Sequence, residues 1–195
     1  HVAGPLGEAS KIDKNASHVV FTGGGLGIAA LYPILKEYHK NHIRTTTVVG
    51  FRSETLIFWE EKLRKVSDKL IITTDDGSKG MKGRVTDGLI DVLKNDKPGL
   101  VYAIGPLPMM RGVALTTKDY NARTIVSLNP IMVDGIGMCG ACRVTVNGET
   151  KYACVQGPEF DAHQVDFDEL ILKNSQFKES EEECYREYVF RNKKS

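Results

Sequence analysis

The sequence predicts an α/β fold in which a five-stranded, parallel, doubly wound sheet precedes a small C-terminal β-hairpin subdomain. Three observations lead to this prediction. Five short apolar runs alternate with four segments of helical periodicity, glycines follow several of the runs, and an Asn-Gly pair separates two alternating runs further along. Short apolar runs separated by helices are typical of parallel sheets covered on both faces. The length of 195 residues suits one domain with a small addition.

The sheet elements are expected in regular order over residues 18–130. The predicted strands are 18–22, 45–50, 70–74, 100–104 and 124–128. The predicted helices are 28–42, 54–66, 84–94 and 109–120. Each of the first four strands is therefore followed by a helix that returns the chain to the same end of the sheet, as parallel strands require.

Composition excludes several classes of function. The chain has 26 basic and 25 acidic residues, and no long basic run, so nucleic acid is not expected as a partner. No apolar stretch is long enough to cross a membrane, and no signal peptide is recognisable. We therefore expect a cytoplasmic protein that does not bind membranes.

A glycine-rich segment follows the first predicted strand. Gly25 to Ala30 fits the G-x-G-x-x-A form of the dinucleotide fingerprint, in which glycines admit a pyrophosphate to the N–H groups at a helix start. The alternative interpretation is a tight strand-to-helix turn without a ligand. The candidate cofactor-binding residues here are Gly24, Gly25, Leu26 and Gly27.

The ends of the next strands carry further candidates, because ligands of such sheets bind beyond the carboxyl ends of the strands. Arg52 follows the second strand and is suited to the adenine, the ribose or a 2′-phosphate, which leaves NAD and NADP both open. The remaining candidates follow the third and fourth strands and are Asp76, Gly77, Ser78, Gly105, Pro106 and Met109.

Three cysteines are close together in the second half of the chain. Cys139 and Cys142 precede an alternating strand, and the Asn147-Gly148 turn returns the chain to Cys154. Asn-Gly between alternating runs is a strong hairpin signal. The hairpin is therefore expected to bring the three thiols together in a metal site.

The spacing of these residues favours iron and sulfide over zinc. With Asp134 in the place of a first cysteine, the pattern D-x4-C-x2-C-x11-C is similar to plant-type [2Fe–2S] ferredoxins. The predicted metal ligands are thus Asp134, Cys139, Cys142 and Cys154. Two alternatives stay open: a zinc site completed by His163, and a loop capped by Asp134 with Cys184 as fourth ligand.

The strand ends resemble the NAD(P)-binding domain of the ferredoxin–NADP reductase superfamily. Together with the cysteine loop, they resemble the small subunit of NADH-dependent ferredoxin:NADP oxidoreductases, also known as sulfide dehydrogenases. The electron-transfer subunit of dihydroorotate dehydrogenase shares this plan and is the alternative. Because some members of the former group use one aspartate and three cysteines, Asp134 favours that group.

The resemblance implies a division of the chain. Residues 1–17 would be the remnant or linker of a missing FAD-binding β-barrel, and 18–130 the NAD(P)-binding domain. Residues 131–167 would bind the [2Fe–2S] cluster, and 168–195 would form a charged helix or tail.

The resemblance also implies an oxidoreductase subunit that moves electrons between NAD(H) or NADP(H), FAD and the cluster. FAD would be present only in the full-length protein, so these residues alone are expected to be inactive. No side chain is expected to act as a catalytic acid, base or nucleophile. The implied partner is a large flavin and iron–sulfur catalytic subunit, with ferredoxin as a further candidate. The remaining alternative is a nucleotide-binding module with structural zinc.

Overall fold

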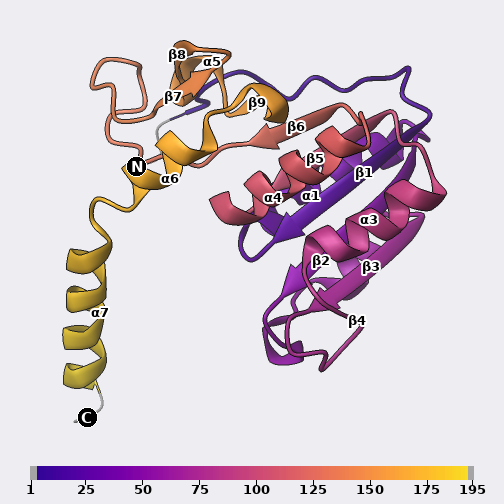
Figure 1. The fold of residues 1–195 in the computed structure, drawn as a ribbon, viewed down its shortest axis with the longest axis horizontal. Coiled ribbons are helices and arrows are strands. Elements are labelled where there is room, and N and C mark those ends of the chain that lie inside the picture. The colour runs from indigo at the N-terminus through magenta and orange to yellow at the C-terminus, as the bar shows by residue number, and fades with distance from the viewer. Residues whose placement is uncertain (1–3, 193–195) are drawn as a thin grey trace.

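A computed structural model describes residues 4–192. The first three residues of the predicted linker and the last three residues of the predicted tail lie outside this range. A seven-stranded sheet has the order β4-β3-β2-β1-β5-β6-β9, shown in Figure 1. The strands are β1 (His18–Gly24), β2 (Arg44–Phe51), β3 (Lys69–Thr74), β4 (Met81–Lys82), β5 (Leu100–Ile104), β6 (Thr124–Ser127) and β9 (Glu159–Asp161). Neighbouring strands are parallel except β6 and β9, which are antiparallel.

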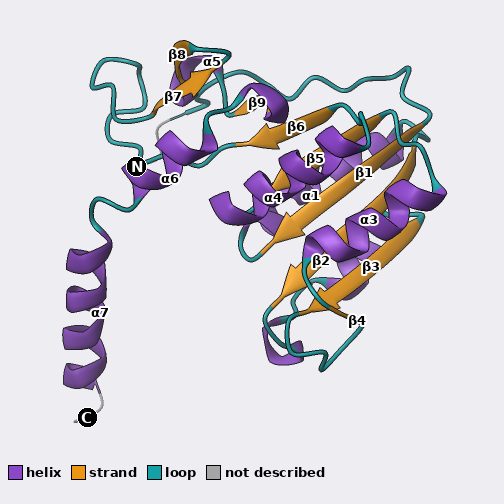
Figure 2. Ribbon diagram, in the orientation of Figure 1, coloured by secondary structure: helices purple, strands orange, loops and turns teal. Residues whose placement is uncertain are grey.

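Helices cover both faces of this sheet (Figure 2). They are α1 (Gly27–Lys40), α2 (Glu60–Arg64), α3 (Val85–Asn95) and α4 (Leu107–Asp119). Side chains of α1 and α2 share one hydrophobic core with the sheet, and those of α3 and α4 share another. Successive residues of β1 alternate between these cores: Val19 and Phe21 face the first, and Val20 faces the second. The predicted doubly wound α/β fold is confirmed.

Two short edge strands and one helix break were not predicted. β4 and β9 have two and three residues, which is too short to give a periodic signal. The predicted helix 54–66 is instead a 3₁₀ turn, η1 (Glu54–Leu56), followed by α2. Trp59 separates them with φ of 60°, a left-handed conformation incompatible with a continuous helix. Its ring packs edge-on against Tyr32 and lies under the Lys62 ammonium group.

The predicted hairpin forms a separate two-stranded sheet of β7 (Arg143–Val146) and β8 (Glu149–Tyr152). Asn147 and Gly148 have φ of 52° and 74°, as a two-residue hairpin turn requires. A short helix, α5 (Ala153–Gln156), follows, and a 3₁₀ turn, η2 (Ala162–Gln164), comes after β9. Val144 and Val146 belong to the same hydrophobic core as α3 and α4. The hairpin is therefore packed onto the layer formed by α3, α4 and the main sheet.

The N-terminal segment of the described chain contacts the rest of the fold, whereas the C-terminal helix extends away from it. Near the N-terminus, Glu8 N donates to the carbonyl oxygen of Gly157 at 2.6 Å, which holds the extended segment beside α5. At the other end, α6 (Phe167–Asn174) packs on the hairpin, and α7 (Lys178–Asn192) extends away from the sheet at the left of Figure 1. Among the described residues, no helix combines the length and apolar character needed to cross a membrane.

A buried histidine at the start of β1 predicts loss of stability in mild acid. The His18 ring nitrogen Nε2 lies 2.9 Å from Thr46 Oγ1, and burial lowers the pKa of His18, with a smaller contribution from Arg44. The unfolded chain then binds the proton more readily, so the free energy of unfolding falls as pH drops below about 6.5. In urea titrations at pH 7.5 and 5.5, His18→Gln is expected to reduce this loss, and exposed His39→Gln is not. Equal pH dependence in the three proteins would contradict the assignment.

Candidate functional site

The predicted fingerprint forms a close crossing of backbones at the carboxyl ends of β1 and β5. Gly25 has φ of 53°, which favours glycine. A methyl group at Gly27 would lie 2.4 Å from the carbonyl oxygen of Ile104 and 2.6 Å from Gly105 Cα. Only a residue without Cβ allows this approach. The first turn of α1 has no acidic residue, and no side chain caps it. Its N–H groups therefore suit an anion.

The turn after β5 lies against the glycine loop. Gly105 is close to the backbone of Gly24, and a methyl group at Gly24 would lie 2.7 Å from Met109 Sδ. Pro106 precedes the first residue of α4, and Met110 is fully buried in the core. The structure thus brings Gly24 to Gly27 together with Gly105, Pro106 and Met109. Their role in binding a nucleotide stays a prediction.

The turns after β2 and β3 form a second, polar group at the same edge. Asp76 Oδ1 accepts hydrogen bonds from Ser78 N at 2.9 Å and Ser78 Oγ at 2.6 Å, and these lower the pKa of Asp76. Ser78 Oγ also accepts from Glu54 N at 2.7 Å, which ties the two turns together. Gly77 has φ of 77°, and Arg52 is exposed nearby on the chain. Because β3, β2, β1 and β5 are adjacent and parallel, all predicted nucleotide-site residues share one edge.

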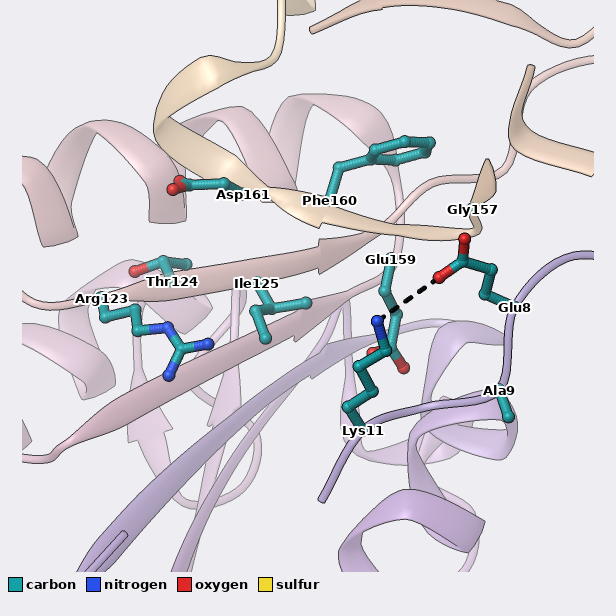
Figure 3. Close-up of a pocket in the computed structure, with 10 residues that line it drawn as sticks. All are labelled: Glu8, Ala9, Lys11, Arg123, Thr124, Ile125, Gly157, Glu159, Phe160 and Asp161. Carbon is teal, nitrogen blue, oxygen red and sulfur yellow. Dashed lines mark ion pairs between the residues drawn. The ribbon is translucent and has the colours of Figure 1, made fainter. Parts of the chain in front are cut away.

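A cavity of about 240 Å³ that the sequence did not predict lies elsewhere, between the N-terminal segment, β6 and β9 (Figure 3). Its polar groups pair with one another: Lys11 Nζ is 3.6 Å from Glu8, and Ser10 Oγ donates to Glu159. Burial raises the pKa of Glu159. Thr124, at the amino end of β6, lines the cavity. The cavity is therefore distinct from the edge where the parallel strands end. The contact between Ser10 and Glu159 joins segments too far apart in the sequence to leave a local signal.

The hairpin brings two of the three clustered cysteines into contact. Cys142 and Cys154 are buried, with their Sγ atoms 3.2 Å apart, and Cys154 N donates to Cys142 Sγ at 3.5 Å. This contact raises the pKa of Cys154. Cys139 is exposed on the preceding loop, where its sulfur accepts from Ala141 N at 3.4 Å. Within the described residues, no three His, Cys, Asp or Glu side chains converge in a metal-binding arrangement.

Asp134 organises the cysteine loop through both carboxylate oxygens. Oδ1 accepts from Ile136 N at 3.0 Å, and Oδ2 accepts from Cys139 N at 2.9 Å. These hydrogen bonds, led by that from Ile136, lower the pKa of Asp134. The carboxylate therefore holds the backbone of Cys139 in place within the loop. These hydrogen bonds agree with the alternative in which Asp134 caps the loop. Metal ligation by Asp134 stays a prediction.

The loop nevertheless fits a group that needs thiolates and backbone donors. Three glycines have φ between 68° and 83°, which turns the chain repeatedly around the cysteines; they are Gly135, Gly137 and Gly140. Backbone N–H groups already point at two of the sulfurs, as described above for Cys139 and Cys142. A thiol-rich donor set with such hydrogen bonds suits an iron–sulfur cluster.

Within the described part of the chain, His163 and Cys184, the two alternative metal ligands, do not contact the clustered cysteines. His163 Nε2 is 3.0 Å from Thr117 Oγ1 on α4, and so it completes no zinc site with the cysteines here. Cys184 is exposed on α7, which extends away from the sheet and the hairpin.

Comparison with known proteins matches both halves of the chain. Residues 21–114 match the oxidoreductase NAD-binding domain, and residues 129–166 match the iron–sulfur cluster binding domain of dihydroorotate dehydrogenase B. The first region contains the glycines at the carboxyl ends of β1 and β5, and the second contains the cysteine loop. A nicotinamide-type domain and an iron–sulfur domain are thus joined in one chain.

Relatives and a solved structure resemble the chain over most of its length. A Thermotoga maritima homologue of the dihydroorotate dehydrogenase B (NAD(+)) electron transfer subunit is 45% identical over 96% of this chain and 66% of its own. The probable corresponding subunit of Methanocaldococcus jannaschii is 35% identical over 85% and 63%. The chain thus spans just under two thirds of these relatives. The structure of an NADH-dependent reduced ferredoxin-NADP oxidoreductase is 46% identical with a TM-score of 0.87, covering 97% of this chain and 68% of that one.

Proposed function

Since the chain belongs to the family of electron-transfer subunits represented by dihydroorotate dehydrogenase B and NADH-dependent reduced ferredoxin-NADP oxidoreductase, we propose that it carries electrons between a nicotinamide, a flavin and an iron–sulfur cluster. The single observation that carries the proposal is the joining of two sites in one chain. The backbone crossing at Gly27 suits a dinucleotide, and the Cys142–Cys154 pair suits a cluster.

The proposal assigns roles to the residues at the sheet edge. N–H groups at the start of α1 would hold the pyrophosphate of NAD(H) or NADP(H), with Gly24 to Gly27 admitting it. Gly105, Pro106 and Met109 would flank the nicotinamide. Arg52 and the turn of Asp76, Gly77 and Ser78 would contact the adenosine half. These residues bind and orient, and none is proposed to move a proton.

The proposal also assigns the metal ligands and the type of cluster. Cys139, Cys142, Cys154 and Asp134 would hold a [2Fe–2S] cluster, which supplies one-electron transfer when bound. Nicotinamides exchange two electrons as a hydride, so FAD is needed to link the two carriers. We therefore propose that these residues alone, without the FAD domain, do not oxidise NAD(P)H.

The partner proposed is a larger catalytic subunit that exchanges electrons with the cluster, as the term electron transfer subunit in the relatives' names implies. Ferredoxin remains a further candidate. The setting proposed is the cytoplasm, because the proposed ligand set needs cysteine thiolates, and cysteines stay reduced in that compartment.

Metal analysis of anaerobically purified protein tests the proposal. We expect visible absorption with about two irons and two sulfides per chain. NADH should leave the colour unchanged until a flavin domain is added. A colourless protein with one tightly held zinc would overturn the electron-transfer assignment.

Asp134 variants test the fourth ligand in the same assay. Asp134→Ala removes both the carboxylate and its loop contacts, and Asp134→Asn keeps an acceptor for one of them. If the carboxylate is a ligand, both variants should alter the visible spectrum. An Asn variant with the parent's spectrum and iron content would instead assign Asp134 to the loop alone.

A further inference from the structure

Lys173 brings a positive charge to the hairpin that carries Cys142. It lies in the last turn of α6, and its Nζ donates to the carbonyl oxygen of Arg143 at 2.9 Å. Arg143 directly follows Cys142 in the chain. The helix is held in place at its start by Asp166, whose Oδ1 accepts from Glu169 N at 2.9 Å, and by the buried side chain of Leu170. The fold therefore fixes the position of the ammonium group.

The hydrogen bond alone has a structural explanation. β7 has β8 on one side, and on its other side the carbonyl oxygen of Thr145 accepts from Asp166 N at 2.9 Å. Lys173 satisfies the corresponding carbonyl of Arg143 further along this edge. A neutral donor would serve this purpose equally well, so the charge of the lysine needs a separate account.

The electrostatics of Lys173 connect it to the cysteine site. Its side chain is partly buried, and this burial lowers the pKa of Lys173, as does Arg143 to a smaller extent. Glu169 and the Cys142 sulfur act in the opposite direction. The geometric link is the hydrogen bond of 2.9 Å from Lys173 Nζ to the carbonyl oxygen of Arg143, the residue that directly follows Cys142. Arg143 adds a second cation, since its Nη1 donates at 3.4 Å to the carbonyl oxygen of Gly140 on the cysteine loop. Asp134, on the same loop, is the opposing negative charge.

We propose that Lys173 is a positioning residue that raises the reduction potential of the cluster held by Cys142, an inference that rests on the proposed function. When bound, the cluster would accept one electron from a reduced flavin, which would add one negative charge at the site without forming or breaking a bond. The fixed ammonium group of Lys173 stabilises this more negative state by Coulomb attraction, which is stronger in a partly desolvated site than in water. The protein thereby makes the cluster easier to reduce.

Potentiometric titration of the cluster-loaded chain, followed by visible absorption and electron paramagnetic resonance at pH 7.5, tests the proposal. Lys173→Met removes the charge, and Lys173→Gln removes it while keeping a donor. Both are expected to shift the reduction equilibrium by about three- to tenfold, which corresponds to a fall of about 28–59 mV for one electron. Lys173→Arg should restore most of the parent's potential. Lys94→Met, an exposed lysine in the last turn of α3, is the matched control and should leave it unchanged.

The outcomes separate this inference from the proposed function. Unchanged potentials in both neutral variants, with iron and sulfide contents equal to the parent's, would overturn the inference and leave the proposed function intact. A Gln variant with the parent's potential would also overturn it, because the donor and not the charge would then matter. Loss of the cluster in both neutral variants would assign Lys173 to structure alone. A parent chain without a cluster would instead contradict the proposed function.

Discussion

Replacing Cys142 by alanine is expected to remove essentially all iron and sulfide from the purified chain. Its sulfur is buried 3.2 Å from that of Cys154, so the substitution deletes a thiolate from the centre of the proposed ligand set. No other cysteine in the described residues lies in position to replace it, since Cys184 is on α7. Iron and sulfide analysis with the visible spectrum measures the effect.

Cys184→Ala is the matched control for this substitution. It removes a thiol from the same chain, but from the exposed surface of α7. Iron, sulfide and colour should equal those of the parent protein. If Cys142→Ala kept a full cluster and Cys184→Ala lost it, the ligand set would have to include the C-terminal helix.

Gly27→Ala is expected to have the largest effect on nucleotide binding. The added methyl group would lie 2.4 Å from the carbonyl oxygen of Ile104, and the nearest atoms are backbone, which has little room to move. The β1–α1 turn must separate from the end of β5. Overpacking of this kind costs about 1–3 kcal/mol of unfolding free energy. Displacement of the helix start should weaken NADH binding at least tenfold, or by about 1.4 kcal/mol.

Urea unfolding and calorimetric titration with NADH and NADPH measure the two effects. Gly99→Ala is the control, because its Cβ would lie 3.8 Å from the nearest backbone atom, just before β5 at the other end of the strand. It should bind the nucleotide as the parent does. A Gly27→Ala protein with unchanged affinity would argue against a dinucleotide at the start of α1.

Sequence reasoning succeeded where the signal is local. The five long strands each contain a run of apolar residues, and Asn147-Gly148 specifies its turn by conformation alone. The meeting of Gly27 with Gly105 was also predictable, because parallel neighbours end at the same edge. The pairing of Cys142 with Cys154 followed from the hairpin between them.

The features that were not predicted depend on contacts between distant parts of the chain. β9 forms by pairing with β6 more than thirty residues earlier, and three residues carry no period of their own. At the helix break, the ring of Trp59 packs against Tyr32, which lies 27 residues earlier on α1. The contact between Lys173 and Arg143 requires knowledge of where α6 ends against the hairpin. The spacing of the sequence could not show whether Asp134 caps the cysteine loop or binds the metal.

The packing of the hairpin has a consequence for the spacing of the two proposed sites. Val144, Val146 and Leu170 share a core with Val126 and Leu128 of the main sheet region. Interiors of this kind are close-packed and resist sliding. The cysteine loop and the strand ends that carry the glycines are therefore parts of one packed body, and the fold sets the separation between them. The proposed nucleotide and cluster sites are thus held at one spacing by this core, and the flavin that would link them has to fit that spacing.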